Sequence, residues 1–146
     1  MKKDKGFTLI EVIAVIGITS IILLFGISST NYYKKIQRDI ETEEFIVSFK
    51  HLLSESKMEA INRDSVVIIT IQNSRKKIKS EENLRLLSSI VIPEYINNVG
   101  KTQISVSSDG RLESGTLIFE NTKDKEKYFF KIRVGVNYIN FEKKKL

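Results

Sequence analysis

The stretch Gly6-Phe7-Thr8-Leu9-Ile10-Glu11 opens an apolar run that continues to Ile27, and this run decides the fold. Of the 21 residues from Phe7 to Ile27, 15 are apolar, and Glu11 is the one ionised residue among them. An α-helix rises about 1.5 Å per residue, so a helix of this length extends roughly 30 Å, the thickness of the hydrocarbon core of a bilayer. A carboxylate at the centre of such a helix costs on the order of 2.5–3.5 kcal/mol to insert, so we expect Glu11 to have a partner or a task.

Three classes of N-terminal segment are compatible with this pattern. A plain membrane anchor would carry Glu11 by chance. A secretory signal peptide would be removed after a small residue such as Gly26 or Ser28, but its apolar centre is normally about 7–15 residues long, shorter than this run. A prepilin leader has a short cationic segment, here Met1–Lys5, followed by a glycine, a bulky apolar residue and then a glutamate.

The segment Gly6-Phe7-Thr8-Leu9-Ile10-Glu11-Val12 resembles the cleavage and methylation signal of type IV pilins and pseudopilins. The resemblance implies that an aspartic membrane peptidase cuts the chain between Gly6 and Phe7 at the cytoplasmic face and then N-methylates Phe7. It also implies that Glu11, the fifth residue of the mature chain, acts in assembly. Most pilins have a proline that kinks the apolar helix, whereas the only proline here is Pro93.

Elementary chemistry agrees with these roles. Gly6 has no side chain, so a protease can approach its backbone closely. Phe7 and Glu11 stand at i and i+4, so we expect them to share one helix face a single turn apart. The carboxylate could then neutralise the new amine of its own chain or of the next subunit, and an unpaired buried charge is strongly destabilising. We therefore predict that Glu11 sets the axial register between subunits.

The basic leader predicts the orientation of the chain. Lys2, Lys3 and Lys5 favour a cytoplasmic N-terminus and leave the C-terminal domain outside. The predicted division is a leader peptide (1–6), a transmembrane and filament-core helix (7–30) and an extracytoplasmic pilin-like globular domain (31–146).

Composition limits the chemistry that the chain can perform. The 146 residues carry a formal net charge of +6 and include no cysteine, which excludes disulfides, thiol catalysis and cysteine-based zinc sites. His51 is the single histidine, so metal sites of the usual nitrogen and sulfur kind cannot be assembled. We expect a protein without metal, cofactor or enzymatic activity.

Residues 33–61 have the periodicity of an amphipathic helix. One apolar stripe consists of Ile36, Ile40 and Val47. A second stripe beside it follows i, i+4, i+7, i+8 spacing and consists of Phe45, Phe49, Leu52, Leu53, Ser56 and Ala60. We expect the upper part of this helix to lie on a sheet.

Residues 66–141 are predicted to form that sheet. Strands are expected at 66–71, 102–107, 117–120, 128–134 and 136–141. In the strand at 128–134 one face is expected to consist of Tyr128, Phe130, Ile132 and Val134, with Lys131 and Arg133 on the other.

The remaining segments are read from charge and turn residues. Residues 74–85 are dense in charge and are expected to form an exposed loop. Residues 86–92 are ambiguous between a strand and a short helix. Residues 121–125 are expected to form a hairpin loop, and residues 143–146 to fray.

A membrane helix that continues into an amphipathic helix and then an antiparallel sheet predicts an α+β, pilin-like fold. Two further stretches resemble a narrower group, the GspH/FimT-type minor pseudopilins. Residues 54–63 followed by Val66-Val67-Ile68 are similar to the helix end and first strand of that group. Residues 108–111 followed by 114–119 are similar to its later hairpin.

One basic cluster, consisting of Arg75, Lys76, Lys77 and Lys79, has two interpretations. It is either a solvated loop or a surface that contacts the phosphates of DNA, in which case binding would be salt-dependent and independent of sequence. The resemblance favours DNA, because some competence pseudopilins and minor pilins take it up. The lack of flanking aromatic residues for base stacking counts against it. If DNA binds, the change Lys76→Glu with Lys77→Glu is expected to abolish its affinity.

The sequence thus predicts a minor pilin or pseudopilin that prepilin peptidase processes and that assembles into a type IV pilus or a competence pseudopilus for DNA uptake. The alternatives are a type II secretion minor pseudopilin, or a surface binding module that is simply membrane-anchored or secreted. Expected partners are the membrane, the peptidase and other pilin subunits, with DNA as a further candidate. The expected location is the cytoplasmic membrane, crossed once with the N-terminus inside, and then a filament at the cell surface or in the periplasm.

Overall fold

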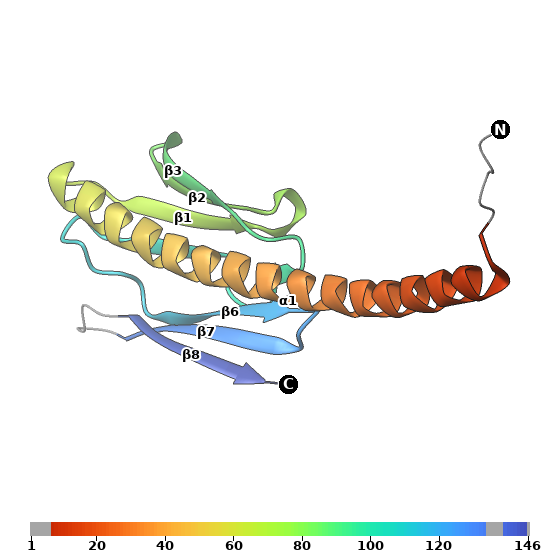
Figure 1. Ribbon diagram of the computed structural model, residues 1–146. Coiled ribbons are helices and arrows are strands. Elements are labelled where there is room, and N and C mark those ends of the chain that lie inside the picture. Colours follow the sequence, from red (N-terminus) through yellow and green to blue (C-terminus); the bar gives the residue numbers. More distant parts are fainter. Residues whose placement is uncertain (1–6, 134–138, 146) are drawn as a thin grey trace, which may run out of the picture. The chain divides into compact units, whose positions relative to one another are not determined.

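The structure is a computed structural model that describes residues 7–133 and 139–145, apart from the side chains of residues 25, 27–29 and 31. In these residues a long helix, α1 (Leu9–Asn62), comes first and β-strands follow it (Figure 1). Residue contacts divide the chain into two units, Met1–Ile40 and Glu41–Leu146. In the second unit, α1 packs on antiparallel sheet, which confirms the predicted α+β fold and is consistent with a pilin-like arrangement.

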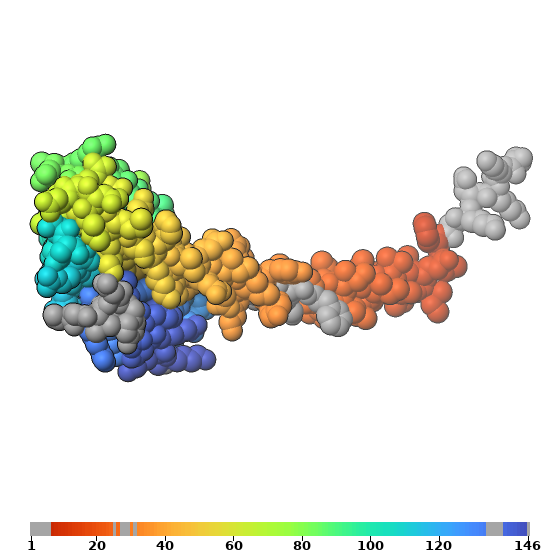
Figure 2. All heavy atoms as spheres, turned by 90° about the vertical axis from the view of Figure 1, so that its left-hand side faces the viewer, coloured from red at the N-terminus to blue at the C-terminus, as the bar shows by residue number. Residues whose placement is uncertain are grey.

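The described strands form two antiparallel sheets. The first has the order β3-β2-β1-β5 and is built from β1 (Val67–Gln72), β2 (Lys77–Glu82), β3 (Arg85–Val91) and β5 (Gln103–Val106). A short 3₁₀ helix, η1 (Asn73–Arg75), links β1 to β2. The second sheet has the order β4-β6-β7-β8 and is built from β4 (Ile96–Asn98), β6 (Gly115–Asn121), β7 (Glu126–Ile132) and β8 (Ile139–Lys145). In Figure 2 the yellow end of α1 lies between the green strands of the first sheet and the blue strands of the second.

The core is centred on the second apolar stripe of α1, whose burial confirms the predicted pattern. Every member of that stripe, from Phe45 to Ala60, is buried. Phe49 stacks edge-to-face on Phe119 of β6 and Phe130 of β7, with ring centroids 5.5 and 4.8 Å away. Edge-to-face aromatic pairs add about 0.5–1.5 kcal/mol each beyond the area that they bury. Aromatic packing therefore helps to fix the helix on the second sheet.

A buried polar contact joins α1 to the first sheet. The hydroxyls of Ser56 and Ser80 lie 2.7 Å apart, and Ser56 also donates a hydrogen bond to the carbonyl of Leu52. Both serines are almost fully buried. Because a buried hydroxyl without a partner is costly, this pair specifies how β2 sits under the helix.

The segment predicted as a charged loop is a hairpin, and that prediction is wrong. Residues 77–82 form β2, in which Ile78 and Ser80 are buried while Lys77 and Lys79 point to the other face. An antiparallel strand with one solvated face tolerates such alternation. Asn83 and Leu84 form the two-residue turn with φ of 46° and 69°, and left-handed values at both positions suit a tight hairpin. The ambiguous residues 86–92 lie largely in its second strand, β3.

Around the second sheet, two predictions are confirmed and one is wrong. The loop at 121–125 is confirmed, because Asn121 Oδ1 accepts hydrogen bonds from the backbone N–H groups of Lys123 and Asp124 between β6 and β7. The predicted fraying at residues 143–145 is wrong, since β8 continues to Lys145. The inward positions of Tyr128, Phe130 and Ile132 are confirmed by burial. Three predicted positions lie outside the described residues: Val134, the first part of the strand predicted at 136–141, and Leu146.

Two ion pairs hold β8 to β7. Lys131 Nζ lies 2.7 Å from Glu142 Oε1, and Lys143 Nζ lies 2.8 Å from Glu126 Oε2. The hydrogen bond from Lys131 is the main cause that lowers the pKa of Glu142. Burial raises the pKa of Glu126, but hydrogen bonds from Lys143 and Tyr128 outweigh it, so this pKa is also lowered.

Acid is expected to destabilise this edge of the sheet. When the pKa of a carboxyl is lower in the folded state, acid protonates the carboxyl of the unfolded chain first. The carboxyl therefore stabilises the fold at a pH above its usual pKa of 4.5, and this stabilisation is lost as the pH falls through the pKa of the folded state. We expect the melting temperature, followed by circular dichroism of the full chain in detergent, to fall below pH about 4.5. Glu126→Gln with Glu142→Gln should flatten this dependence, and an equal loss in that variant would contradict the explanation.

Candidate functional site

The first candidate site is the beginning of α1, where Thr8 and Glu11 cap the helix reciprocally. The Glu11 carboxylate accepts hydrogen bonds from the backbone N–H and the hydroxyl of Thr8, both at 2.8 Å. The backbone N–H of Glu11 donates in turn to Thr8 Oγ1 at 3.4 Å. This is a capping box, in which side chains at the N-cap and at the third helical position satisfy amide groups that the helix leaves open. Glu11 is thereby held against the backbone amide that follows Phe7.

The cap changes one geometric expectation for this site. The helix begins at Leu9, so Phe7 precedes it and does not share a helical face with Glu11. The physical reason is that Thr8, as the N-cap, takes a non-helical conformation and ends the helix there. Phe7 is 88% exposed. Gly6 and the rest of the leader, residues 1–5, lie outside the described residues.

Thr8 is the residue that the sequence analysis missed. The pattern Thr8-x-x-Glu11 immediately before an apolar run is itself a capping-box signal, so the information was present in the sequence. Loss of the cap alone costs a helix about 0.5–2 kcal/mol. The carboxylate thus has a partner within its own chain.

An apolar sleeve follows the cap. We use this name for the exposed large apolar side chains between Leu9 and Leu24, which range from 45% exposed at Val12 to 79% at Leu9. Thr19 and Ser20 interrupt the sleeve, but their hydroxyls donate to backbone carbonyls one turn back, at Val15 and Ile16. No helical stretch of the described residues combines the length and the hydropathy that a membrane span needs. A helix that is apolar on all sides is normally covered by other apolar groups.

The basic cluster is the second candidate, and the structure shows that one of its members, Lys76, is bound by its own chain. Lys76 has a left-handed φ of 49°, and its Nζ donates to the carbonyls of Glu94 and Ile96 and to Asn97 Oδ1, at 2.7–2.8 Å. Lys79 Nζ lies 3.7 Å from Glu81. Arg75 ends the short helix η1, and Lys77 points outward from β2.

Lys76→Met is expected to destabilise the fold rather than to alter an exposed surface. The change removes three hydrogen bonds that hold the connection between β3 and β4, and unsatisfied acceptors cost about 1–3 kcal/mol. Lys77→Met, at the neighbouring exposed position, should change stability by less than about 0.5 kcal/mol. Thermal unfolding of the two variants compares them directly, and equal effects would contradict a structural role for Lys76.

The described residues offer little for metal chemistry. Among them, no three histidine, aspartate or glutamate side chains come together as ligands of a metal ion would. His51 is exposed on α1. The absence of enzymatic activity stays a prediction.

Comparison with known proteins adds one finding. The family model described as the prokaryotic N-terminal methylation motif matches residues 1–27. No curated protein matches the chain, and no solved structure matches it. The motif is the type IV pilin signal, so it implies processing by prepilin peptidase and assembly with other pilin subunits. The matched residues include Gly6, Phe7, the Thr8–Glu11 cap and the apolar sleeve.

Proposed function

We propose that this chain is a minor pilin or pseudopilin, similar to the GspH/FimT type, that is cleaved between Gly6 and Phe7, N-methylated on Phe7 and assembled into a filament through α1. The observation that carries the proposal is the apolar sleeve, which lies within the residues matched by the methylation motif. The protein would cross the cytoplasmic membrane once, with residues 7–30 in the membrane or filament core and residues 31–146 outside. It would have no catalytic activity.

The sleeve explains why such a protein leaves the membrane only into a filament. Its side chains are apolar on all sides, and its hydroxyls are satisfied by its own backbone. Lipid can cover such a helix, and so can the sleeves of neighbouring subunits. A helical array in which each copy contacts the next through a different surface covers every sleeve except at the ends.

Glu11 would act at the moment of transfer. Cleavage creates a positive amine on Phe7, and the Glu11 carboxylate already lies against the adjacent amide of Thr8. In the filament core that amine requires a carboxylate, either from its own chain or from the neighbour. If the amine of one subunit meets the carboxylate of its neighbour at only one axial offset, this pairing sets the register between the subunits.

The subunit would serve one of two kinds of system. The first is a competence or type IV pilus, and the second is a type II secretion pseudopilus. DNA contact by the basic cluster is not part of the proposal, because Lys76 is bound by its own chain and Lys79 by Glu81. For the same reason the informative variant for DNA binding is Arg75→Glu with Lys77→Glu, which leaves the Lys76 contacts in place. A salt-dependent affinity lost in that variant would add DNA to the proposal.

The proposed function is tested by the fate of a tagged chain in its own host. Filaments sheared from the cell surface, or pseudopili induced by overproduction of the system, should contain the tagged chain when prepilin peptidase is present. In a strain without the peptidase, and in the variant Gly6→Leu, the chain should stay in the membrane at full length. Its absence from the filament fraction of the unmodified strain would refute the proposal.

A further inference from the structure

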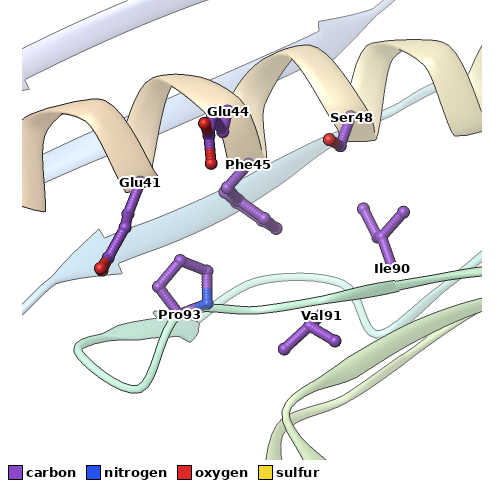
Figure 3. A pocket seen from close by; sticks show the side chains of 7 residues that line it. All are labelled: Glu41, Glu44, Phe45, Ser48, Ile90, Val91 and Pro93. Atoms are coloured by element: carbon purple, nitrogen blue, oxygen red, sulfur yellow. The ribbon is translucent and has the colours of Figure 1, made fainter.

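A groove runs between α1 and the edge strand β3 in the second unit. It consists of two adjoining hollows of about 380 and 280 Å³ that share Ser48 and Ile90. Figure 3 shows the larger hollow, with Phe45 and Ser48 of α1 opposite Val91 and Pro93. The floor of the groove is apolar and includes Leu52 in the smaller hollow.

The rim of the groove on the helix side is anionic. Glu41, Glu44, Ser48, His51 and Glu55 follow one another at spacings of three and four residues, so they line one side of α1. Among the described lining residues there are three glutamates and no lysine or arginine. The rim extends over about 21 Å at the rise of an α-helix. An anionic rim above an apolar floor is complementary to a segment that carries apolar side chains beside cations.

The same chain carries such a segment. The first apolar stripe of the sequence analysis is not buried, because Ile36 is 37% exposed and Ile40 is 53% exposed. Tyr33, three residues before Ile36, is 69% exposed. We call Tyr33, Ile36 and Ile40 the stem stripe. They lie at i, i+3 and i+7, on one helical face about 10 Å long, and Lys34 and Lys35 are exposed beside them.

We propose that the groove of one copy of this chain binds the stem stripe of a second copy, with Lys34 and Lys35 beside the glutamates of the rim. The inference rests on the proposed function, because it requires copies to lie side by side with their helices aligned. Groove and stripe are different surfaces, so the contact is heterologous and repeats along a filament instead of closing into a dimer. It covers apolar side chains that the second unit leaves exposed, such as Val91 at 67%.

Disulfide trapping tests the contact, because the natural chain has no cysteine and every introduced thiol is the only one in its copy. Two differently tagged copies, one with Ser48→Cys and one with Ile36→Cys, are co-expressed in the host and oxidised in the membrane and filament fractions. A disulfide forms only when the two Cα atoms approach to about 4.4–6.8 Å, so only direct contact is captured. We expect a mixed dimer from this pair. The matched control replaces Ser48→Cys by Met58→Cys, an exposed position of α1 outside the groove, and should give none.

Charge exchange supplies a second measurement. Lys35→Glu in the stripe copy should lower the yield of the mixed dimer at least about twofold, as expected when an exposed ion pair becomes repulsive. Glu44→Lys in the groove copy should restore it.

The outcomes separate this inference from the proposed function. If the tagged copies co-purify in filaments but the Ser48→Cys and Ile36→Cys pair gives no dimer, or no more than the Met58→Cys control, the groove contact is refuted while the filament role stands. If the copies are not cleaved and do not co-purify, both are refuted.

Discussion

Glu11→Ala is expected to leave the chain inserted and cleaved but to abolish its incorporation into filaments. Cleavage depends on the backbone at Gly6 and Phe7, which this change does not touch. In the filament core the amine of Phe7 would lose its carboxylate. An uncompensated buried charge costs on the order of 3–5 kcal/mol, which is more than about a hundredfold in the assembly equilibrium. The measurement is the ratio of tagged chain in the sheared filament fraction to chain in the membrane.

The Thr8–Glu11 cap requires a second variant, because alanine removes the cap and the charge together. Glu11→Gln keeps an acceptor at the third helical position, where glutamine also completes a capping box, and removes the charge alone. If the charge is needed, Glu11→Gln fails to incorporate as completely as Glu11→Ala. Normal incorporation of Glu11→Gln would assign the role to the cap, and normal incorporation of Glu11→Ala would refute both.

Phe49→Ala is expected to give the largest loss of stability in the globular unit. Phe49 is 0% exposed and contacts aromatic rings of both α1 and the second sheet. Removing a buried phenylalanine side chain costs about 3–5 kcal/mol, from lost transfer energy and from the cavity that remains. Since a whole domain is stable by only about 5–15 kcal/mol, the melting temperature should fall by more than 10 °C, roughly.

Met58→Ala is the matched control for Phe49→Ala. Met58 lies on the same helix, is 64% exposed, and has nearly the helix propensity of alanine. Its expected effect is within about 0.5 kcal/mol. Both melting temperatures are measured on the full chain in detergent, and a loss of equal size in the two variants would contradict the view that the aromatic cluster holds α1 on the second sheet.

The parts of the fold that the sequence revealed are those in which local spacing reports burial. The stripe from Phe45 to Ala60 has helical spacing, and the positions from Tyr128 to Ile132 alternate, so in each case a single element shows which face meets the core. The first stripe, with Ile36 and Ile40, shows the limit of this signal. Its spacing is equally helical, yet both of these side chains are exposed. Periodicity indicates that a face is apolar but not what covers it.

The hairpin of β2 and β3 was hidden for a different reason. Its many charged residues make the alternation of inward and outward positions hard to recognise. Ser80 is buried beside Ser56, which lies 24 residues earlier and provides a hydrogen-bond partner. The turn at Asn83 and Leu84 lacks the glycine that usually marks a tight hairpin. Pairing with a distant partner, rather than composition, decides the structure of this segment.

The residues of the candidate sites also fall into those that the sequence identifies and those that it does not. The processing motif is linear, so Gly6, Phe7 and Glu11 could be identified from their order alone. Lys76 could not, because the acceptors of its ammonium group lie 18 to 21 residues further along the chain. What reads as a basic cluster in the sequence is therefore one structural lysine and three surface cations in the fold.

The most direct test of the central claim is the intact mass and amino-terminal sequence of the protein isolated from its own host membrane. The prepilin pathway predicts a chain that begins at an N-methylated Phe7 and lacks residues 1–6. A chain that begins at Met1 would mean a simple anchor, and one that begins near Ser29 would mean a secreted binding module. Either of these would contradict the account and remove the role proposed for Glu11.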